Sequence, residues 1–187
     1  MAAASGGYRT LLEDVSPERL EQSVAWIKEA LDDGVLRGEG AASSRGALSL
    51  ISAVHNVEDA IRDADLILEA VPEELEMKLE LFTLFDKFAR PSAILASSSF
   101  AFSIGEMTDV TTSQGRCVGM RFCNSEPGGK LIEIVKTSLT SEVTVASCRE
   151  VVRRMGKEAV IVDESAITIT TRDTRTTENP VPDSSLA

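Results

Sequence analysis

Residues 64–88, ADLILEAVPEELEMKLELFTLFDKF, decide the fold class of this sequence. Residues 66–69 are a short apolar run, which is typical of a buried strand. After the Val71-Pro72 step, leucine and phenylalanine side chains recur at helical spacing, which predicts a helix that ends before Arg90-Pro91. A buried strand that runs directly into an amphipathic helix is the repeating unit of α/β proteins.

The same alternation of strand and helix extends in both directions from this stretch. We expect strands at residues 8–13, 51–54, 93–96, 117–122, 131–135 and 159–162, and helices at residues 17–34, 57–62 and 141–155. This order predicts a doubly wound, mostly parallel sheet in one domain, residues 1–163. Residues 164–187 are rich in Thr, Asp, Pro and Ser without an apolar period, and we predict a disordered tail there.

Ligands of open α/β sheets bind where the carboxyl end of a strand meets the next helix. In residues 64–88 that junction carries Ala70, Glu73 and Lys78, which are therefore candidate ligand-binding residues. The serines at residues 97–99 follow the next expected strand in the same way. A serine run in that place is most often a plain helix cap.

Residues 116–135, RCVGMRFCNSEPGGKLIEIV, contain two β-prone runs joined by a polar turn rich in glycine. They are expected to form strand, loop and strand. Arg121 and Glu133 lie near opposite ends of that loop, as in a catalytic loop that ends in an acid. The two charges either form a charge-assisted hydrogen bond or remain two solvated side chains on the loop rim, and the sequence leaves both alternatives open.

The composition argues against several kinds of partner. A formal net charge of -11 over 187 residues disfavours nucleic acid and anionic membranes, which bind basic surfaces. No apolar run approaches the ~18 residues of a membrane span. The N-terminal MAAASGG lacks the basic start and apolar core of a secretion signal, so we expect a cytoplasmic location. The three cysteines show no C-x-x-C spacing and suggest neither a disulfide framework nor a zinc site.

Three segments together carry a family resemblance. DADLILEAVPEELEMKLELF, ILASSSFAFSIGEM and VGMRFCNSEPGGKLIEIV occur in this order along the chain. In their order and separation they closely resemble the NAD-binding domain of the 3-hydroxyacyl-CoA dehydrogenases, including the 3-hydroxybutyryl-CoA enzymes, over about residues 6–163. The resemblance implies a Rossmann-like fold, NAD as cofactor, and an acyl-CoA substrate whose 3-hydroxyl is oxidised in fatty acid or butanoate metabolism.

The resemblance also implies which residues contact the cofactor. Asp14 stands where the family has an acidic residue that holds the adenosine ribose through its hydroxyls. The other positions that match family residues near the cofactor are Ala70, Glu73, Lys78, Ser98 and Asn124. Asn124 corresponds to the asparagine of the family's H-F-x-N-P motif.

The implied catalytic positions depart from the family. Glu133 matches the carboxylate that orients a catalytic histidine, which removes the proton from the 3-hydroxyl while hydride passes to the nicotinamide. Arg121 occupies the histidine's position, and a guanidinium does not accept a proton at any ordinary pH. Phe100 replaces the serine that positions the substrate hydroxyl, and Ser98 replaces an asparagine. Losing a general base typically costs a factor of ~10² to 10⁴ in rate.

Further parts of the family lie outside the matched region. The first strand and its G-x-G-x-x-G turn, which holds the pyrophosphate, should precede residue 1, and a helical domain that completes the acyl-CoA site and the dimer should follow. Without the glycine-rich turn, NAD binding should be weakened. The strands beside the missing one should expose unpaired edges, through which homo- or hetero-oligomers could form.

Three hypotheses follow from the sequence. The chain is an active NAD-dependent 3-hydroxyacyl-CoA dehydrogenase, or a truncated relative that is catalytically inactive or severely impaired, or a non-catalytic interaction or regulatory module that pairs its exposed strands with another chain. The replacements at Arg121 and Phe100 favour the second hypothesis over the first.

Overall fold

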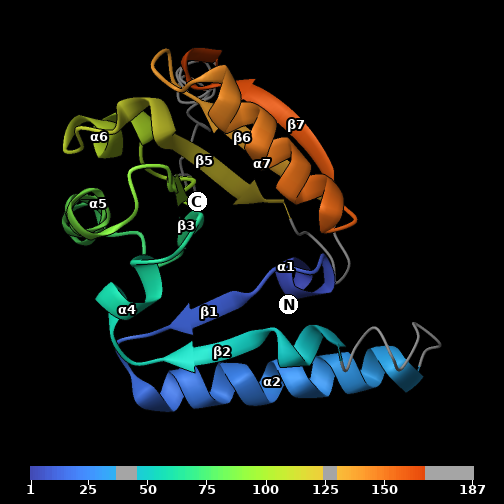
Figure 1. Cartoon of the computed structure of the whole chain (residues 1–187). Coiled ribbons are helices and arrows are strands. Elements are labelled where there is room, and N and C mark those ends of the chain that lie inside the picture. The colour runs from blue at the N-terminus through green and yellow to red at the C-terminus, as the bar shows by residue number, and fades with distance from the viewer. Residues whose placement is uncertain (37–45, 124–129, 167–187) are drawn as a thin grey trace, which may run out of the picture.

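The computed structural model describes residues 1–36, 46–123 and 130–166 of the chain. Its strands form two sheets, one of two strands and one of five (Figure 1). Helices cover the strands in the alternating order that the sequence predicts. The mostly parallel α/β architecture is therefore confirmed.

The smaller sheet lies at the N-terminal end of the chain. Strand β1 (Thr10–Glu13) pairs in parallel with β2 (Ile51–Val54). These strands pack with α1 (Ala2–Ser5) and with the long helix α2 (Pro17–Leu36), which runs beside them in Figure 1. A separate core fills this part of the molecule, formed by the buried residues Ala4, Ile27, Leu31 and Ala47.

The larger sheet follows a short connecting helix, α4 (Val57–Ile61), whose first turn is capped by the side chain of Asn56. Its strands lie in the order β3 (Leu66–Glu69), β4 (Ile94–Ser97), β5 (Cys117–Phe122), β6 (Leu131–Lys136) and β7 (Glu158–Asp163). All neighbours are parallel except β5 and β6, which form an antiparallel hairpin. The expected strand, loop and strand of residues 116–135 are thus confirmed for the two strands.

Helices cover both faces of the larger sheet because successive strand residues point in opposite directions. Leu95 of β4 joins a core cluster with Phe82 and Phe85 of α5 (Leu75–Phe88). The next residue, Ala96, joins a second cluster, which includes Cys148 and Val152 of α7 (Glu142–Arg154). This division of one sheet between two cores is the doubly wound arrangement.

A short segment between β4 and β5 corrects one expectation. The serines at residues 97–99 do not cap a helix. The next helix is α6 (Ile104–Asp109), and its cap is Ser103, which forms a capping box with Glu106. A 3₁₀ turn, Gln114–Arg116, then leads into β5. The hydroxyls of Ser97 and Ser99 donate hydrogen bonds to carboxylates of the preceding strand–helix unit instead.

The C-terminal part of the described chain remains ordered just past β7. Residues 164–166 are helical, and the Glu164 carboxylate accepts hydrogen bonds from the backbone N–H groups of Ile104 and Gly105 in α6. The rest of the predicted tail, residues 167–187, lies outside the described residues.

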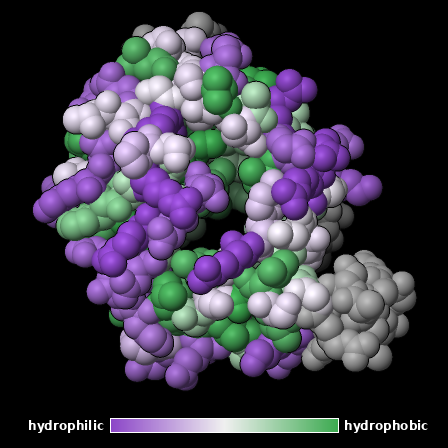
Figure 2. Space-filling model, in the orientation of Figure 1, coloured by the Kyte–Doolittle hydropathy of each residue, from purple (hydrophilic) through white to green (hydrophobic). Residues whose placement is uncertain are grey.

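The two sheets are not hydrogen-bonded to each other in the described part of the chain. Each of them presents an edge strand, β1 in the smaller sheet and β3 in the larger one. Figure 2 shows the surface hollowed between the two bodies. As expected from the sequence, strand edges are therefore left unpaired within the residues that the structure covers. No helix among those residues is long and apolar enough to cross a membrane.

Candidate active site

The candidate site lies where parallel strands β3, β4 and β5 reach their carboxyl ends. The register pairs Glu69 with Ser97 and Ser97 with Gly119, so β3 and β4 end level with Gly119, and β5 continues past that point to Phe122. Arg121 lies two residues beyond Gly119 on β5. This is the edge at which open α/β sheets bind ligands.

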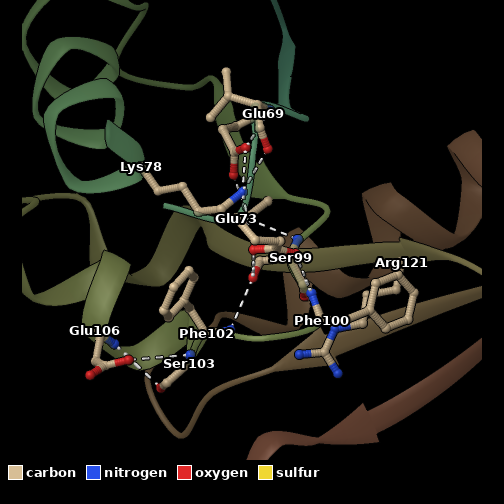
Figure 3. Close-up of polar contacts among 11 residues, drawn as sticks. Glu69, Glu73, Lys78, Ser99, Phe100, Phe102, Ser103, Glu106 and Arg121 are labelled. Carbon is tan, nitrogen blue, oxygen red and sulfur yellow. Dashed lines mark hydrogen bonds and ion pairs between the residues drawn. The ribbon is translucent and has the colours of Figure 1, made fainter. Parts of the chain in front are cut away.

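Glu69 organises this edge and is buried. Its Oε1 accepts the Val71 backbone N–H at 2.7 Å and the Lys78 ammonium at 2.8 Å. Its Oε2 accepts the Ser97 hydroxyl at 2.6 Å (Figure 3). The carboxylate therefore joins β3 to β4 and to α5, and it keeps hydrogen-bond partners on both oxygens although it is out of water.

Lys78 projects from α5 into the same cluster, and its side chain is only 1% exposed. Besides Glu69, the ammonium donates to the Val71 carbonyl at 3.1 Å and lies 3.5 Å from Glu73 Oε2. The contact with Glu69 is fully buried, whereas the Glu73 side chain is 43% exposed. The structure thus gives Lys78 a structural role as the counter-charge of Glu69, and its predicted contact with a cofactor stays a prediction.

Glu73, at the start of the α5 segment, holds the loop that follows β4. Its carboxylate accepts the Ser99 hydroxyl at 2.8 Å and the Phe100 backbone N–H at 3.0 Å. Partial burial opposes ionisation of Glu73, but these hydrogen bonds and the Lys78 charge outweigh it and lower the Glu73 pKa. Glu73 therefore remains an anion that fixes the position of residues 99–100.

Arg121 lies against this loop and does not form the charge pair that was one alternative. Its Nε donates to the Ser99 carbonyl at 2.7 Å, and its guanidinium carbon lies 5.3 Å from the centre of the Phe100 ring (Figure 3). Arg121 and Glu133 are register partners on β5 and β6, yet no ion pair within 4.0 Å joins them among the described residues. The paired prediction is therefore wrong, because Arg121 turns toward the β4 loop instead.

The other alternative, two solvated side chains on a loop rim, is also wrong. Arg121 is only 6% exposed, and both residues lie within the hairpin strands. Glu133 is half-buried and close to Cys123. Burial, followed by the charge of Glu133 and its hydrogen bond, raises the pKa of the Cys123 thiol, which keeps that thiol protonated.

Asp14 lies away from this cluster, just past the carboxyl end of β1. Its side chain accepts the Ser16 backbone N–H at 2.8 Å at the turn into α2. It also lines a hollow of about 530 Å³, together with Arg19 and Trp26. A carboxylate that faces such a space can accept hydrogen bonds from the hydroxyls of a bound sugar.

The remaining predicted positions are placed as follows. Ala70 is exposed and directly follows β3, while Ser98 is half-buried and donates its backbone N–H to the Glu69 carbonyl. Phe100 is 60% exposed beside Arg121. Asn124 lies outside the described residues. The structure thus gathers Ala70, Glu73, Lys78, Ser98, Phe100, Arg121 and Glu133 around the ends of β3 to β6, and it leaves Asp14 on the other sheet.

Sequence reasoning missed Glu69, Ser97 and Ser99 as members of the site. The sequence predicts only that Glu69 ends a buried strand and that the serines cap a helix. One signal was available: a carboxylate that ends an otherwise apolar strand needs a counter-charge when it is buried, and Lys78 on the following helix can supply it. The serines carried no comparable signal, because their acceptors lie on another strand–helix unit.

These features define a class of protein: a doubly wound α/β domain with polar groups at the carboxyl ends of its strands, as in dinucleotide-binding enzymes. The comparison with known families is specific. The family model for the NAD-binding domain of 3-hydroxyacyl-CoA dehydrogenase matches residues 1–165. The chain therefore belongs to the 3-hydroxyacyl-CoA dehydrogenase family through its NAD-binding domain, which implies NAD as the cofactor.

Individual relatives agree with this assignment. A probable 3-hydroxybutyryl-CoA dehydrogenase of Bacillus subtilis is 32% identical over 163 residues, which are 87% of this chain and 56% of the relative. The mitochondrial hydroxyacyl-coenzyme A dehydrogenase of Sus scrofa is 33% identical over 165 residues, 84% of this chain and 52% of the relative. The solved 3-hydroxybutyryl-CoA dehydrogenase of Escherichia coli K12 superposes with a TM-score of 0.83 at 30% identity, covering 87% of this chain and 34% of that one. The chain thus spans about half the length of the curated relatives it matches.

Proposed function

We propose that this chain is an NAD-binding domain of the 3-hydroxyacyl-CoA dehydrogenase type that does not carry out the family's reaction at a useful rate. The observation that carries the proposal is the position of Arg121. Its Nε–H donates to the Ser99 carbonyl, and Phe100 lies against the guanidinium. A group that is always protonated cannot remove the proton of a 3-hydroxyl.

The cofactor side of the proposal rests on Asp14. The hollow beside Asp14 is lined by the Asp14 carboxylate and by the exposed indole of Trp26, which suits the ribose and the flat base of a dinucleotide. When bound, NAD supplies the hydride acceptor of the family's reaction. This chain's contribution would be to hold the ribose hydroxyls at Asp14, while Glu73 and Lys78 shape the β3–α5 turn.

The direct test is an assay of acetoacetyl-CoA reduction with NADH. We expect no turnover above background from this chain, because a missing general base alone costs a factor of ~10² to 10⁴. A Bacillus subtilis relative serves as the positive control. Turnover that the Glu133→Gln variant abolishes would show an intact catalytic loop and contradict the proposal.

A reciprocal experiment tests the effect of the two replaced residues on the rate independently of the length of the chain. Arginine and phenylalanine are placed at the positions of the Bacillus subtilis relative that match Arg121 and Phe100. The rate should fall by a factor of ~10² or more if these residues are sufficient to remove proton transfer. A relative that keeps its full rate would show that they are not.

A second function is favoured by the unpaired edges of β1 and β3. A module of this kind would add a strand of another chain, or a second copy of itself, to one of these edges. Size-exclusion chromatography combined with a pull-down tests it. A clean monomer that captures no partner argues against this function and leaves the first proposal standing. The cytoplasmic location expected from the sequence remains a prediction that cell fractionation would test.

A further inference from the structure

Strand β7 forms the outer margin of the larger sheet. Among the residues that the structure covers it pairs on one side only, with β6 (Figure 1). Two apolar side chains at its middle are exposed, Val160 by 44% and Ile161 by 40%. An edge strand with exposed apolar residues is a template on which another strand can pair. This margin lies at the opposite side of the larger sheet from β3.

The hydrogen bonds between β7 and β6 determine which residues of β7 face outward. The Glu158 N–H donates to the Lys130 carbonyl at 2.7 Å, on the side of β6. Backbone groups alternate in direction along a strand. The odd-numbered residues Ala159, Ile161 and Asp163 therefore present their N–H and C=O groups at the outer edge, and an added strand has to hydrogen-bond to these residues.

A second copy of β7 meets this condition in an antiparallel pair. Directly opposite residues are either both hydrogen-bonded or both not, so an odd-numbered residue has to lie opposite an odd-numbered one. A two-fold axis through Val160 satisfies this requirement and places Ala159 opposite Ile161 of the second copy. The same axis places Lys157 opposite Asp163 at both ends of the pair, which joins opposite charges twice.

The neighbouring registers with the same alternation lack this complementarity. An axis through Ile161 places Glu158 opposite Glu164, and like charges directly opposite each other destabilise a strand pair. An axis through Ala159 leaves Lys157 opposite Ile161, so the lysine meets no opposite charge. Charge complementarity thus selects the axis through Val160.

We propose that the chain forms a homodimer in which the β7 strands of two copies pair in antiparallel about a two-fold axis through Val160. The five-stranded sheet then continues into that of the second copy. The two Val160 side chains lie directly opposite each other, at the Cβ separation of ~4.5–5.5 Å usual for such neighbours, and bury each other. The interface requires neither NAD nor turnover, so it can be tested independently of the proposed function.

The test is analytical ultracentrifugation of the full chain over a range of protein concentrations, which should show a reversible equilibrium of monomer and dimer. Val160→Lys brings two positive charges together at the axis and should weaken association by about tenfold or more. The matched control is Val143→Lys on α7, where the valine is 76% exposed, and it should leave association unchanged. Circular dichroism checks that both variants are folded.

Three outcomes of this experiment would overturn the proposal. One is a chain that stays monomeric at every concentration. Another is a dimer that Val160→Lys does not weaken, because its interface would then lie elsewhere, for example at β1 or β3. The third is a monomer that dimerises only after residues 167–187 are removed, which would mean that the chain's own C-terminal residues occupy the edge.

Charge reversal tests the register. Lys157→Glu and Asp163→Lys should each weaken the homodimer, because each variant places like charges opposite each other at both ends of the pair. Mixing the two variants should restore association as a heterodimer, since both end pairs then join opposite charges again. Variants that stay monomeric when mixed would contradict the proposed register.

Disulfide cross-linking tests the position of the axis. Under oxidation, Val160→Cys should give a covalent dimer. Ile161→Cys should not, because the two copies of residue 161 are diagonal neighbours ~7–8 Å apart, beyond the Cα separation of ~7 Å that a disulfide spans. Cross-linking of Val160→Cys no greater than that of the unmodified chain, or equal to that of Ile161→Cys, would exclude an axis through Val160.

Discussion

The pair Glu69 and Lys78 shows how a buried charge at one residue determines the geometry of a whole turn. The carboxylate ends β3, and the ammonium comes from α5, nine residues later in the chain. Their contact at 2.8 Å places Val71 N–H and the Val71 carbonyl in the same network. The turn between strand and helix is therefore fixed by charges and not only by the proline at residue 72.

The first prediction concerns this pair. Lys78→Met fills a similar volume but leaves the Glu69 carboxylate buried without a counter-charge, and it should lower the free energy of unfolding by about 3–5 kcal/mol. Urea denaturation followed by circular dichroism measures the change. Lys87→Met, at an exposed position of the same helix, should stay within about 0.5 kcal/mol of the unmodified chain. Equal stability of the two variants would refute the structural role of Lys78.

At the scale of elements, α6 packs closely on the β5–β6 hairpin because Gly119 has no side chain. A Cβ at this position would lie 2.9 Å from Val135 Cβ and 3.1 Å from Ile104 Cδ1. Real Cβ atoms do not approach so closely, so a helix or a strand would have to shift. Gly119 thereby sets the distance between α6 and the strand that carries Arg121.

The second prediction follows from this close packing. Gly119→Ala should lower the free energy of unfolding by about 1–3 kcal/mol, the usual cost of overpacking a core. The control is Gly46→Ala, a helical glycine whose added Cβ would meet nothing within 4 Å. Alanine is the better helix former there, so the control should be neutral or slightly stabilising. Thermal unfolding of both variants gives the comparison, and an unchanged midpoint for Gly119→Ala would contradict the packing.

The strands were predictable from the sequence, whereas the polar network between them was not. The apolar run at residues 66–69 and the runs at residues 51–54 and 117–122 have the bounds of the observed strands, because turn residues and charges delimit them. The contacts of Ser97 with Glu69 and of Ser99 with Glu73 join positions 28 and 26 residues apart. No local period records such a pairing, and it depends on the order of the strands in the sheet.

Arg121 illustrates the same limit at the site. Its position could be predicted from the hairpin, and the charge pair with Glu133 was a reasonable expectation for neighbours across two strands. The Ser99 carbonyl, 22 residues earlier in the chain, is the acceptor instead. That carbonyl is available because Glu73 holds the loop after β4, and this dependence is visible only in three dimensions.

At the scale of the whole molecule, the chain consists of two bodies with separate cores. The body of β1 and β2 has four buried hydrophobic residues in its cluster, Ala4, Ile27, Leu31 and Ala47. The body of β3 to β7 has two larger clusters, one on each face of its sheet. A sheet of two strands has little stability by itself, so the smaller body depends on α2 and on its connection through α4.

The third prediction is that the two bodies open separately. Amide hydrogens of Thr10–Glu13 and Ile51–Val54 should exchange with solvent at lower opening free energies than those of Cys117–Phe122 and Leu131–Lys136, since regions with few buried contacts unfold locally first. Hydrogen–deuterium exchange with mass spectrometry of peptides from both bodies measures this difference. Uniform protection across all four strands would show a single cooperative unit.

Trp26 gives the smaller body one more property. It is the only tryptophan in the sequence, its side chain is 63% exposed, and it lines the same hollow as Asp14. Indole emission from the unlabelled chain therefore comes from Trp26 alone. A shift in its emission wavelength, or quenching of its fluorescence, reports a ligand that enters that hollow. The molecule carries a built-in fluorescent reporter at its proposed ribose position, which lies in a different body from Arg121 and can be read without a dye.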